Sequence, residues 1–168
     1  DVSGYSRLFL TPTHYPAPEM YEKGVKTDLF RGERRNPNIK MMDRALREAT
    51  NAAIRENGLY EVLLVDRNGS ITEGSRSNVF FIKNGEVYTA PSDKVLLGVT
   101  RSKVIEIIRD MGVTLHEEAP AAADIAEYQA AFISGTSPKV LPIASIGDVG
   151  FNVNDPVLRS IMEKYSSI

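Results

Sequence analysis

The stretch from Tyr60 to Pro91 constrains the fold of this 168-residue chain more than any other part of it. It reads YEVLLVDRNGSITEGSRSNVFFIKNGEVYTAP, with apolar runs on both sides of two turn signals, DRNG and KNGE. An Asn-Gly pair between apolar runs is a strong hairpin signal, because a type I′ turn needs positive φ at both of its central residues. Several antiparallel strands are therefore predicted between residues 60 and 90.

Two segments around this region have the period of amphipathic helices. Residues 41–57 place Met, Ala, Leu and Ile side chains on one face and Arg and Glu side chains on the other, and Gly58 follows as a stop signal. Residues 98–112 carry a second apolar stripe at helical spacing and end at Gly112. Shorter or later helices are predicted at residues 18–22, 121–128 and 156–165.

Further strands are predicted from apolar runs at residues 5–11, 25–30, 113–116, 129–135 and 139–147. Strands come in runs with helices interspersed, without the regular alternation of a doubly wound sheet. This order indicates the α+β (mixed α/β) class. The length fits one domain with its own core.

The composition argues against several classes of function. The formal net charge is -2 and the sequence pI about 5.8, which gives no electrostatic basis for binding nucleic acid or a membrane surface. Without cysteine, disulfides, thiolate metal sites and a cysteine nucleophile are excluded. The two histidines have no carboxylates at metal-ligand spacing, so no metal site is predicted. A signal peptide and a membrane-spanning run are also missing from these residues, and a cytoplasmic location is expected.

Lys40 stands in the segment NPNIKMMD, between a proline-bearing extended stretch and the start of a predicted helix. An amine attacks a carbonyl only when it is neutral, so a nucleophilic lysine needs burial or positive neighbours that lower its pKa. Arg34 and Arg35 are close in sequence. Taken alone, the position is typical of a solvated surface lysine.

Two short segments are suited to hold an anion. Gly98–Thr100 opens a predicted helix, whose N-terminus presents free N–H groups and the positive end of the helix dipole. The turn Gly135–Ser137 follows a strand and can bind phosphate or carboxylate through backbone amides. Taken alone, the first segment is typical of an N-cap threonine and the second of an ordinary turn.

Glu73 lies among the apolar strands of the hairpin region. An acid there is usually exposed at a turn, whereas a buried one needs a charge partner, which a protonated ring nitrogen would supply. A nucleophilic amine, an acid for a ring nitrogen and two anion-binding segments are together what pyridoxal phosphate requires. The combination therefore favours a site for this cofactor over four unrelated ordinary features.

The segments NIK, YEVLLVDRNGSITEGSRSNVFFIKNGEVYTAP, LLGVTR and FISGTSPKVLPI resemble, in order and spacing, the class IV (fold type IV) pyridoxal-phosphate aminotransferases. This family includes branched-chain and D-amino acid aminotransferases and aminodeoxychorismate lyase. The resemblance implies the large domain of these enzymes, a mainly antiparallel, barrel-like sheet packed with helices. It also implies that residues 1–168 are the C-terminal, cofactor-binding domain and that the smaller N-terminal domain is absent from this chain.

The resemblance also implies roles for individual residues. Lys40 would be the catalytic Schiff-base lysine, and Glu73 the partner of the pyridine nitrogen. The other implied cofactor contacts are Leu96 on the ring and, around the phosphate, Gly98, Val99, Thr100 and Thr136. Ser137 lies where the substrate carboxylate is held, and Arg76 either reaches the substrate region or points to solvent.

The activity that the resemblance implies is transamination between an amino acid and a 2-oxo acid, by a homodimer. Two alternatives stay open: elimination of pyruvate by a lyase-like enzyme, and a cofactor-free binding or assembly module with the same fold. Ala45 stands five residues after Lys40, where branched-chain enzymes often have a tyrosine. The amino acid specificity is therefore left open.

Overall fold

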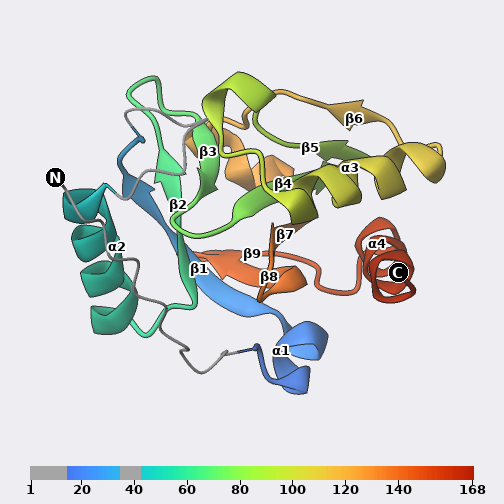
Figure 1. Cartoon of the computed structure of the whole chain (residues 1–168), viewed down its shortest axis with the longest axis horizontal. Helices are drawn as coiled ribbons and strands as arrows, with labels where there is room; N and C mark the ends of the chain where they lie inside the picture. Colours follow the sequence, from blue (N-terminus) through green and yellow to red (C-terminus); the bar gives the residue numbers. More distant parts are fainter. Residues whose placement is uncertain (1–14, 35–42) are drawn as a thin grey trace, which may run out of the picture.

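The structure, a computed structural model, describes residues 15–34 and 43–168. The strands in these residues are β1 (Val25–Arg31), β2 (Glu61–Val65), β3 (Ile71–Gly74), β4 (Asn78–Lys83), β5 (Glu86–Tyr88), β6 (Leu115–His116), β7 (Ala130–Gly135), β8 (Lys139–Ile146) and β9 (Val149–Gly150). They form one sheet in the order β3-β2-β1-β8-β7-β4-β5-β6, with β9 paired to β8. Figure 1 shows this sheet as a curved layer with helices around it. The predicted mixed α/β class is confirmed, whereas the strand predicted at residues 5–11 lies outside the described residues.

The α-helices of the described residues are α1 (Pro18–Lys23), α2 (Arg44–Glu56), α3 (Val99–Asp110) and α4 (Pro156–Ser166). Short 3-10 helices cover Ser92–Lys94 and Ala122–Glu127. The start of α2 follows from its cap, because the Asp43 side chain accepts a hydrogen bond from the Leu46 amide at 3.1 Å. Asp155 caps α4 in the same way.

The two predicted hairpins are present. Strands β4 and β5 pair antiparallel, and Asn84 and Gly85 between them have φ of 53° and 78°, as the Asn-Gly signal requires. Strands β2 and β3 also pair antiparallel, and the Asp66 carboxylate accepts hydrogen bonds from the amides of Asn68 and Ser70. Local turn chemistry therefore sets this part of the fold.

The sequence patterns did not predict the direction of β1 relative to its neighbouring strands. It pairs parallel with both β2 and β8, while most other pairs in the sheet are antiparallel. In sequence α2 lies between β1 and β2, so this part of the chain is a single βαβ unit. In Figure 1, α2 stands beside β2 at one end of the sheet.

The sheet has a separate apolar cluster on each face. One cluster includes Leu63, Val79, Phe81 and Ile133, with partly buried tyrosines packed against it. The other includes Phe80 and Phe132 together with side chains of α3 and α4. Alternate residues of β4 and β7 therefore serve opposite faces, as expected for strands buried on both sides.

Truncating Phe132 is expected to destabilise the protein strongly. Its ring stacks on Phe80 with centroids 4.9 Å apart, and both side chains are fully buried. Phe132→Ala should lower the free energy of unfolding by about 3–5 kcal/mol, because the lost contacts leave a cavity. Urea unfolding measures the change, with Ile168→Ala as a control at a side chain that is 72% exposed. Equal midpoints for the two variants would contradict this account of the core.

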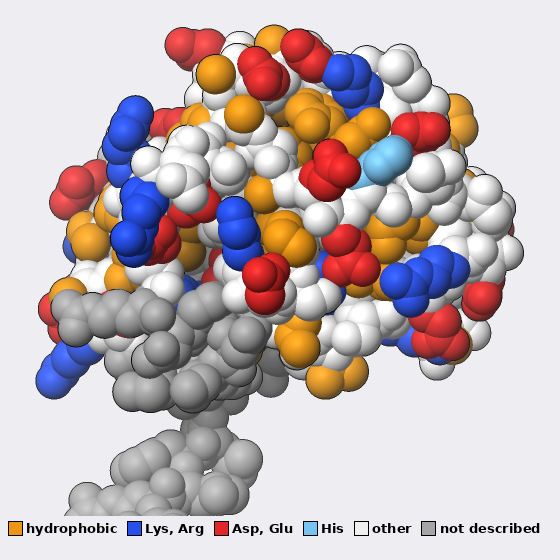
Figure 2. Space-filling view, turned by 90° about the horizontal axis from the view of Figure 1, so that it is seen from above, with side chains coloured by type: hydrophobic (Ala, Val, Ile, Leu, Met, Phe, Trp, Pro, Cys, Tyr) orange, Lys and Arg blue, Asp and Glu red, His pale blue; other side chains and the backbone are white. Residues whose placement is uncertain are grey.

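None of the helices within residues 15–34 and 43–168 combines the length and the apolar character needed to cross a bilayer. On the face shown in Figure 2, Lys and Arg side chains are interspersed with Asp and Glu side chains.

Candidate functional site

The candidate site lies along one edge of the sheet, where several strands begin or end. Strand β3 ends at Gly74 and β4 begins at Asn78, which is paired with Ser134 near the end of β7. The turn between β7 and β8 carries Thr136 and Ser137, and it therefore lies beside the turn between β3 and β4. Residues far apart in the sequence meet at this edge for that reason.

Glu73 is the buried acid of this edge, with 3% of its surface exposed. Its Oε1 accepts a hydrogen bond from Arg34 Nε at 2.8 Å, and its Oε2 accepts one from the Leu96 amide at 3.2 Å. Burial raises the pKa of the Glu73 carboxyl, while the Arg34 charge and the Leu96 amide act in the opposite direction. The charge partner that a buried Glu73 needs is therefore present within the chain itself.

The loop before α3 is fastened to the sheet by Asn78. The Asn78 side-chain amide donates to the Leu96 carbonyl at 2.9 Å. Gly98 is the N-cap of α3, and no side chain caps the helix. Thr100, which is 6% exposed, lies within the first turn, so the ordinary reading of Thr100 as the N-cap is wrong. Val99 is 87% exposed, and the first amides of α3 are left without a capping side chain.

Gly98 is needed because of this fastening, and Gly98→Ala is expected to weaken anion binding at the helix start. A Cβ at this position would lie 2.7 Å from Asn78 Oδ1, although the φ of -69° suits any residue. Overpacking of this kind costs about 1–3 kcal/mol, so affinity for pyridoxal phosphate, the cofactor that the sequence resemblance implies, should fall by about tenfold or more. Fluorescence titration measures it, with Gly150→Ala as control because the nearest atom there lies 4.0 Å away. Unchanged affinity in Gly98→Ala would count against a role for this loop.

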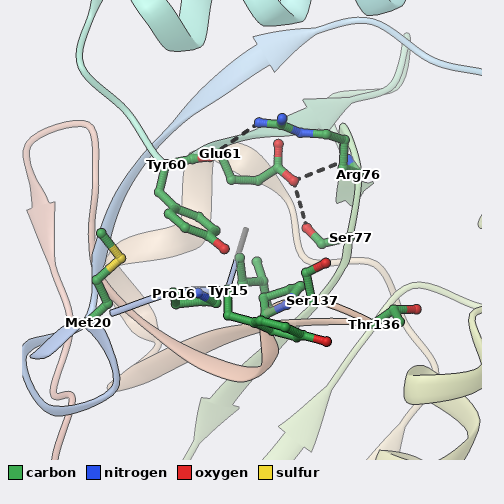
Figure 3. Close-up of a pocket in the computed structure, with 11 residues that line it drawn as sticks. Tyr15, Pro16, Met20, Tyr60, Glu61, Arg76, Ser77, Thr136 and Ser137 are labelled. Atoms are coloured by element: carbon green, nitrogen blue, oxygen red, sulfur yellow. Dashed lines mark hydrogen bonds between the residues drawn. The ribbon is translucent and has the colours of Figure 1, made fainter. Parts of the chain in front are cut away.

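A cavity of about 410 Å³ opens at the same edge (Figure 3). Its lining residues come from α1 and the segment before it, from the start of β2 and the residue before it, from β7, and from the turns after β3 and β7: Tyr15, Pro16, Met20, Tyr60, Glu61, Arg76, Ser77, Ile133, Thr136, Ser137 and Pro138. Arg76 is exposed, and its guanidinium contacts the Tyr60 carbonyl at 3.5 Å. Burial raises the pKa of the Tyr60 phenol. Of the predicted residues, the cavity brings together Arg76, Thr136 and Ser137.

Glu61 is a site residue that sequence reasoning missed. Its carboxylate is buried and accepts hydrogen bonds from the Ser75 hydroxyl at 2.6 Å and the Ser77 hydroxyl at 2.9 Å. It also accepts from the Arg76 amide at 3.1 Å and from the Val62 amide at 3.0 Å. Figure 3 shows this carboxylate beside Ser77 and Arg76 of the turn after β3, with dashed lines to both residues. The available signal was an acid at the start of the apolar run EVLLV, where burial demands several donors.

Lys40 lies outside the described residues, so its role stays a prediction. The structure describes all the other predicted site residues, and they fall into two groups. One group is Glu73, Leu96 and the start of α3, and the other is Arg76, Thr136 and Ser137. In the first group, the Leu96 amide donates a hydrogen bond to Glu73, and Leu96 precedes Gly98 and the start of α3. The residues of the second group all line the cavity.

Comparison with known proteins shows which family this chain resembles. The family model for amino-transferase class IV matches residues 5–146. The probable branched-chain-amino-acid aminotransferase of Rickettsia conorii is 32% identical over 139 residues, which are 79% of this chain and 48% of the relative. The branched-chain-amino-acid aminotransferase of Escherichia coli K12 is 29% identical over 114 residues, 66% of this chain and 37% of the relative.

Among solved structures, the branched-chain amino acid aminotransferase from Thermobaculum terrenum in its PLP form is similar with a TM-score of 0.79. The likeness covers 90% of this chain and 53% of that one at 24% identity, and it supports the fold. The chain spans 48% and 37% of the lengths of these two curated relatives.

Proposed function

Because the chain belongs to the class IV aminotransferases, a family of pyridoxal-phosphate enzymes, we propose that it takes part in transamination between an amino acid and a 2-oxo acid. In this proposal residues 1–168 correspond to the C-terminal, cofactor-binding domain. The observation that carries the proposal is Glu73, a buried carboxylate with an ion-pair partner, hydrogen-bonded to the loop that leads into an uncapped helix N-terminus.

The described residues fit the cofactor in two respects. A pyridine nitrogen needs an acid that is sheltered from water, and Glu73 is 3% exposed. A phosphate needs free N–H groups, which the uncapped start of α3 offers. When bound, pyridoxal phosphate supplies an electron sink for the charge left on the substrate's α-carbon.

Each residue then has a defined task. The Lys40 amine would hold the cofactor and, when free, would move the α-proton of the substrate as a general base. Glu73 would hold a proton on the ring nitrogen. Leu96 would lie against the ring, the Val99 amide and the hydroxyls of Thr100 and Thr136 would hold the phosphate, and Ser137 would hold the substrate carboxylate. We assign the adjoining cavity to the substrate, with Arg76 at its rim.

Reconstitution with the cofactor tests the proposal. Protein mixed with pyridoxal phosphate should gain an absorbance band at the edge of the visible range, and borohydride should fix the cofactor to Lys40, as peptide mass spectrometry can show. With an amino acid and a 2-oxo acid, the amino group should move between them. Release of pyruvate from aminodeoxychorismate without a 2-oxo acid would identify a lyase instead. The absence of both the band and the fixation would leave a cofactor-free module.

The proposal includes a homodimer in the cytoplasm. Leu97 and Val99 are large apolar side chains exposed beside the start of α3, 56% and 87% exposed respectively. Sedimentation of the active protein tests the assembly, and a fully active monomer would contradict it.

A further inference from the structure

Arg34 is fixed at two points beside Glu73. Its Nε donates to Glu73 Oε1 at 2.8 Å, and its Nη2 donates to the Ser75 carbonyl at 2.9 Å. The side chains of Arg34 and Glu73 are 15% and 4% exposed. Two contacts through one planar guanidinium fix the orientation of Arg34, so its hydrogen bond holds Glu73 Oε1 from a set direction, which a lysine could not do.

Arg34 makes the largest contribution in favour of the charged form of Glu73, while burial is the larger effect and keeps the pKa of the carboxyl above its ordinary value. Among the described residues, the groups that act on the Glu73 carboxylate are Arg34, the Leu96 amide and the carboxylate of Glu61. Burial and Glu61 both oppose ionisation, and the Leu96 amide gives one neutral hydrogen bond. Arg34 is therefore the positive side chain that favours the charged form.

We infer that Arg34 is a positioning residue for Glu73, holding it as an anion in a fixed orientation before any cofactor arrives. Arg34 occupies Oε1, while Oε2 accepts one hydrogen bond from the Leu96 amide and, as a carboxylate oxygen, has room for a second donor. The inference rests on the proposed role of Glu73 as partner of the ring nitrogen. In this inference, Arg34 favours the charged form of Glu73 before the cofactor binds.

The charge can be measured without cofactor. In protein labelled with ¹³C at glutamate carboxyl groups, the Glu73 signal is the one that Glu73→Gln removes, and its shift against pH gives the midpoint of ionisation. Removing the guanidinium in Arg34→Gln takes away a group that lowers the pKa of Glu73. The midpoint should therefore rise, by about one to three pH units for a charge at this distance. A midpoint that is unchanged or lower overturns the inference.

Arg67→Gln is the matched control, because Arg67 also pairs with a glutamate, Glu33, but with 79% of its side chain exposed. It should leave the Glu73 midpoint unchanged. If Arg34→Gln does not fold, Arg34→Lys serves in its place. A point charge without the second contact predicts a smaller upward shift, and no upward shift overturns the inference.

Cofactor binding separates this inference from the proposed function. Between the two midpoints, Arg34→Gln should bind pyridoxal phosphate about tenfold more weakly than the natural protein, since a charge-assisted hydrogen bond is roughly twice as strong as a neutral one. In the Glu73→Gln background the same change should have little effect, because the carboxylate on which Arg34 acts is gone. An equal effect in both backgrounds would show a merely structural role and overturn the inference. A midpoint that moves without any change in cofactor affinity would support the ion pair and overturn the cofactor role of Glu73.

Discussion

Lys40→Ala is expected to abolish amino-group transfer. The lysine amine has two tasks in the proposed reaction, since it holds the cofactor and then moves the α-proton. General acid–base catalysis alone contributes about 10²–10⁴-fold, and covalent attachment adds to it, so a loss of about 10⁴-fold or more is expected. A coupled assay for the keto acid product measures the rate, and the absorbance band should be absent from the variant.

Lys26→Ala is the control for this result, because Lys26 is an exposed lysine on β1. It should retain both the band and the rate. If Lys40→Ala kept the band, and borohydride still fixed the cofactor, another amine would be the nucleophile and the assignment of Lys40 would be wrong.

Glu73→Gln should reduce turnover by about 10²–10³-fold, the usual effect of removing one group that stabilises charge in a transition state. Glutamine is nearly the same size but carries no charge, so the ring nitrogen would lose the partner that keeps it protonated. The cofactor should still be fixed by borohydride, and turnover is expressed per fixed cofactor to separate catalysis from occupancy.

Glu118→Gln, at an exposed acid, controls for the loss of one negative charge and should be fully active. Turnover in Glu73→Gln equal to that of the natural protein would remove Glu73 from the ring nitrogen.

The parts of the fold that depend on local chemistry were predictable from the sequence. The pair Asn84-Gly85 predicted the hairpin of β4 and β5, because few other residues adopt positive φ. Gly58 marked the end of α2, where it has a φ of 61°, whereas the helix starts after Asp43 and not at residue 41 as predicted. The parallel pairing of β1 was not predictable, because alternation within a strand does not reveal the direction of its neighbours.

The candidate site was predictable to a similar extent. Family order pointed to Glu73 and to the start of α3, and the hydrogen bond from Leu96 joins them. The sequence placed Arg34 near Lys40, but the structure pairs it with Glu73, 39 positions away. Glu61 was missed for the same reason, because all its donors except the Val62 amide lie 14 to 16 positions further along the chain. Contacts over such separations depend on the register of the sheet.

The hydrogen bonds of Glu61 limit what the adjoining cavity can recognise. A serine hydroxyl has one proton to donate and lone pairs to accept with. Ser77 lines the cavity, and its hydroxyl donates its one hydrogen bond to the Glu61 carboxylate. Toward a bound molecule it can therefore act only as an acceptor. At this point of the wall, an N–H or O–H of the ligand is matched, whereas a carbonyl or carboxylate oxygen would face lone pairs.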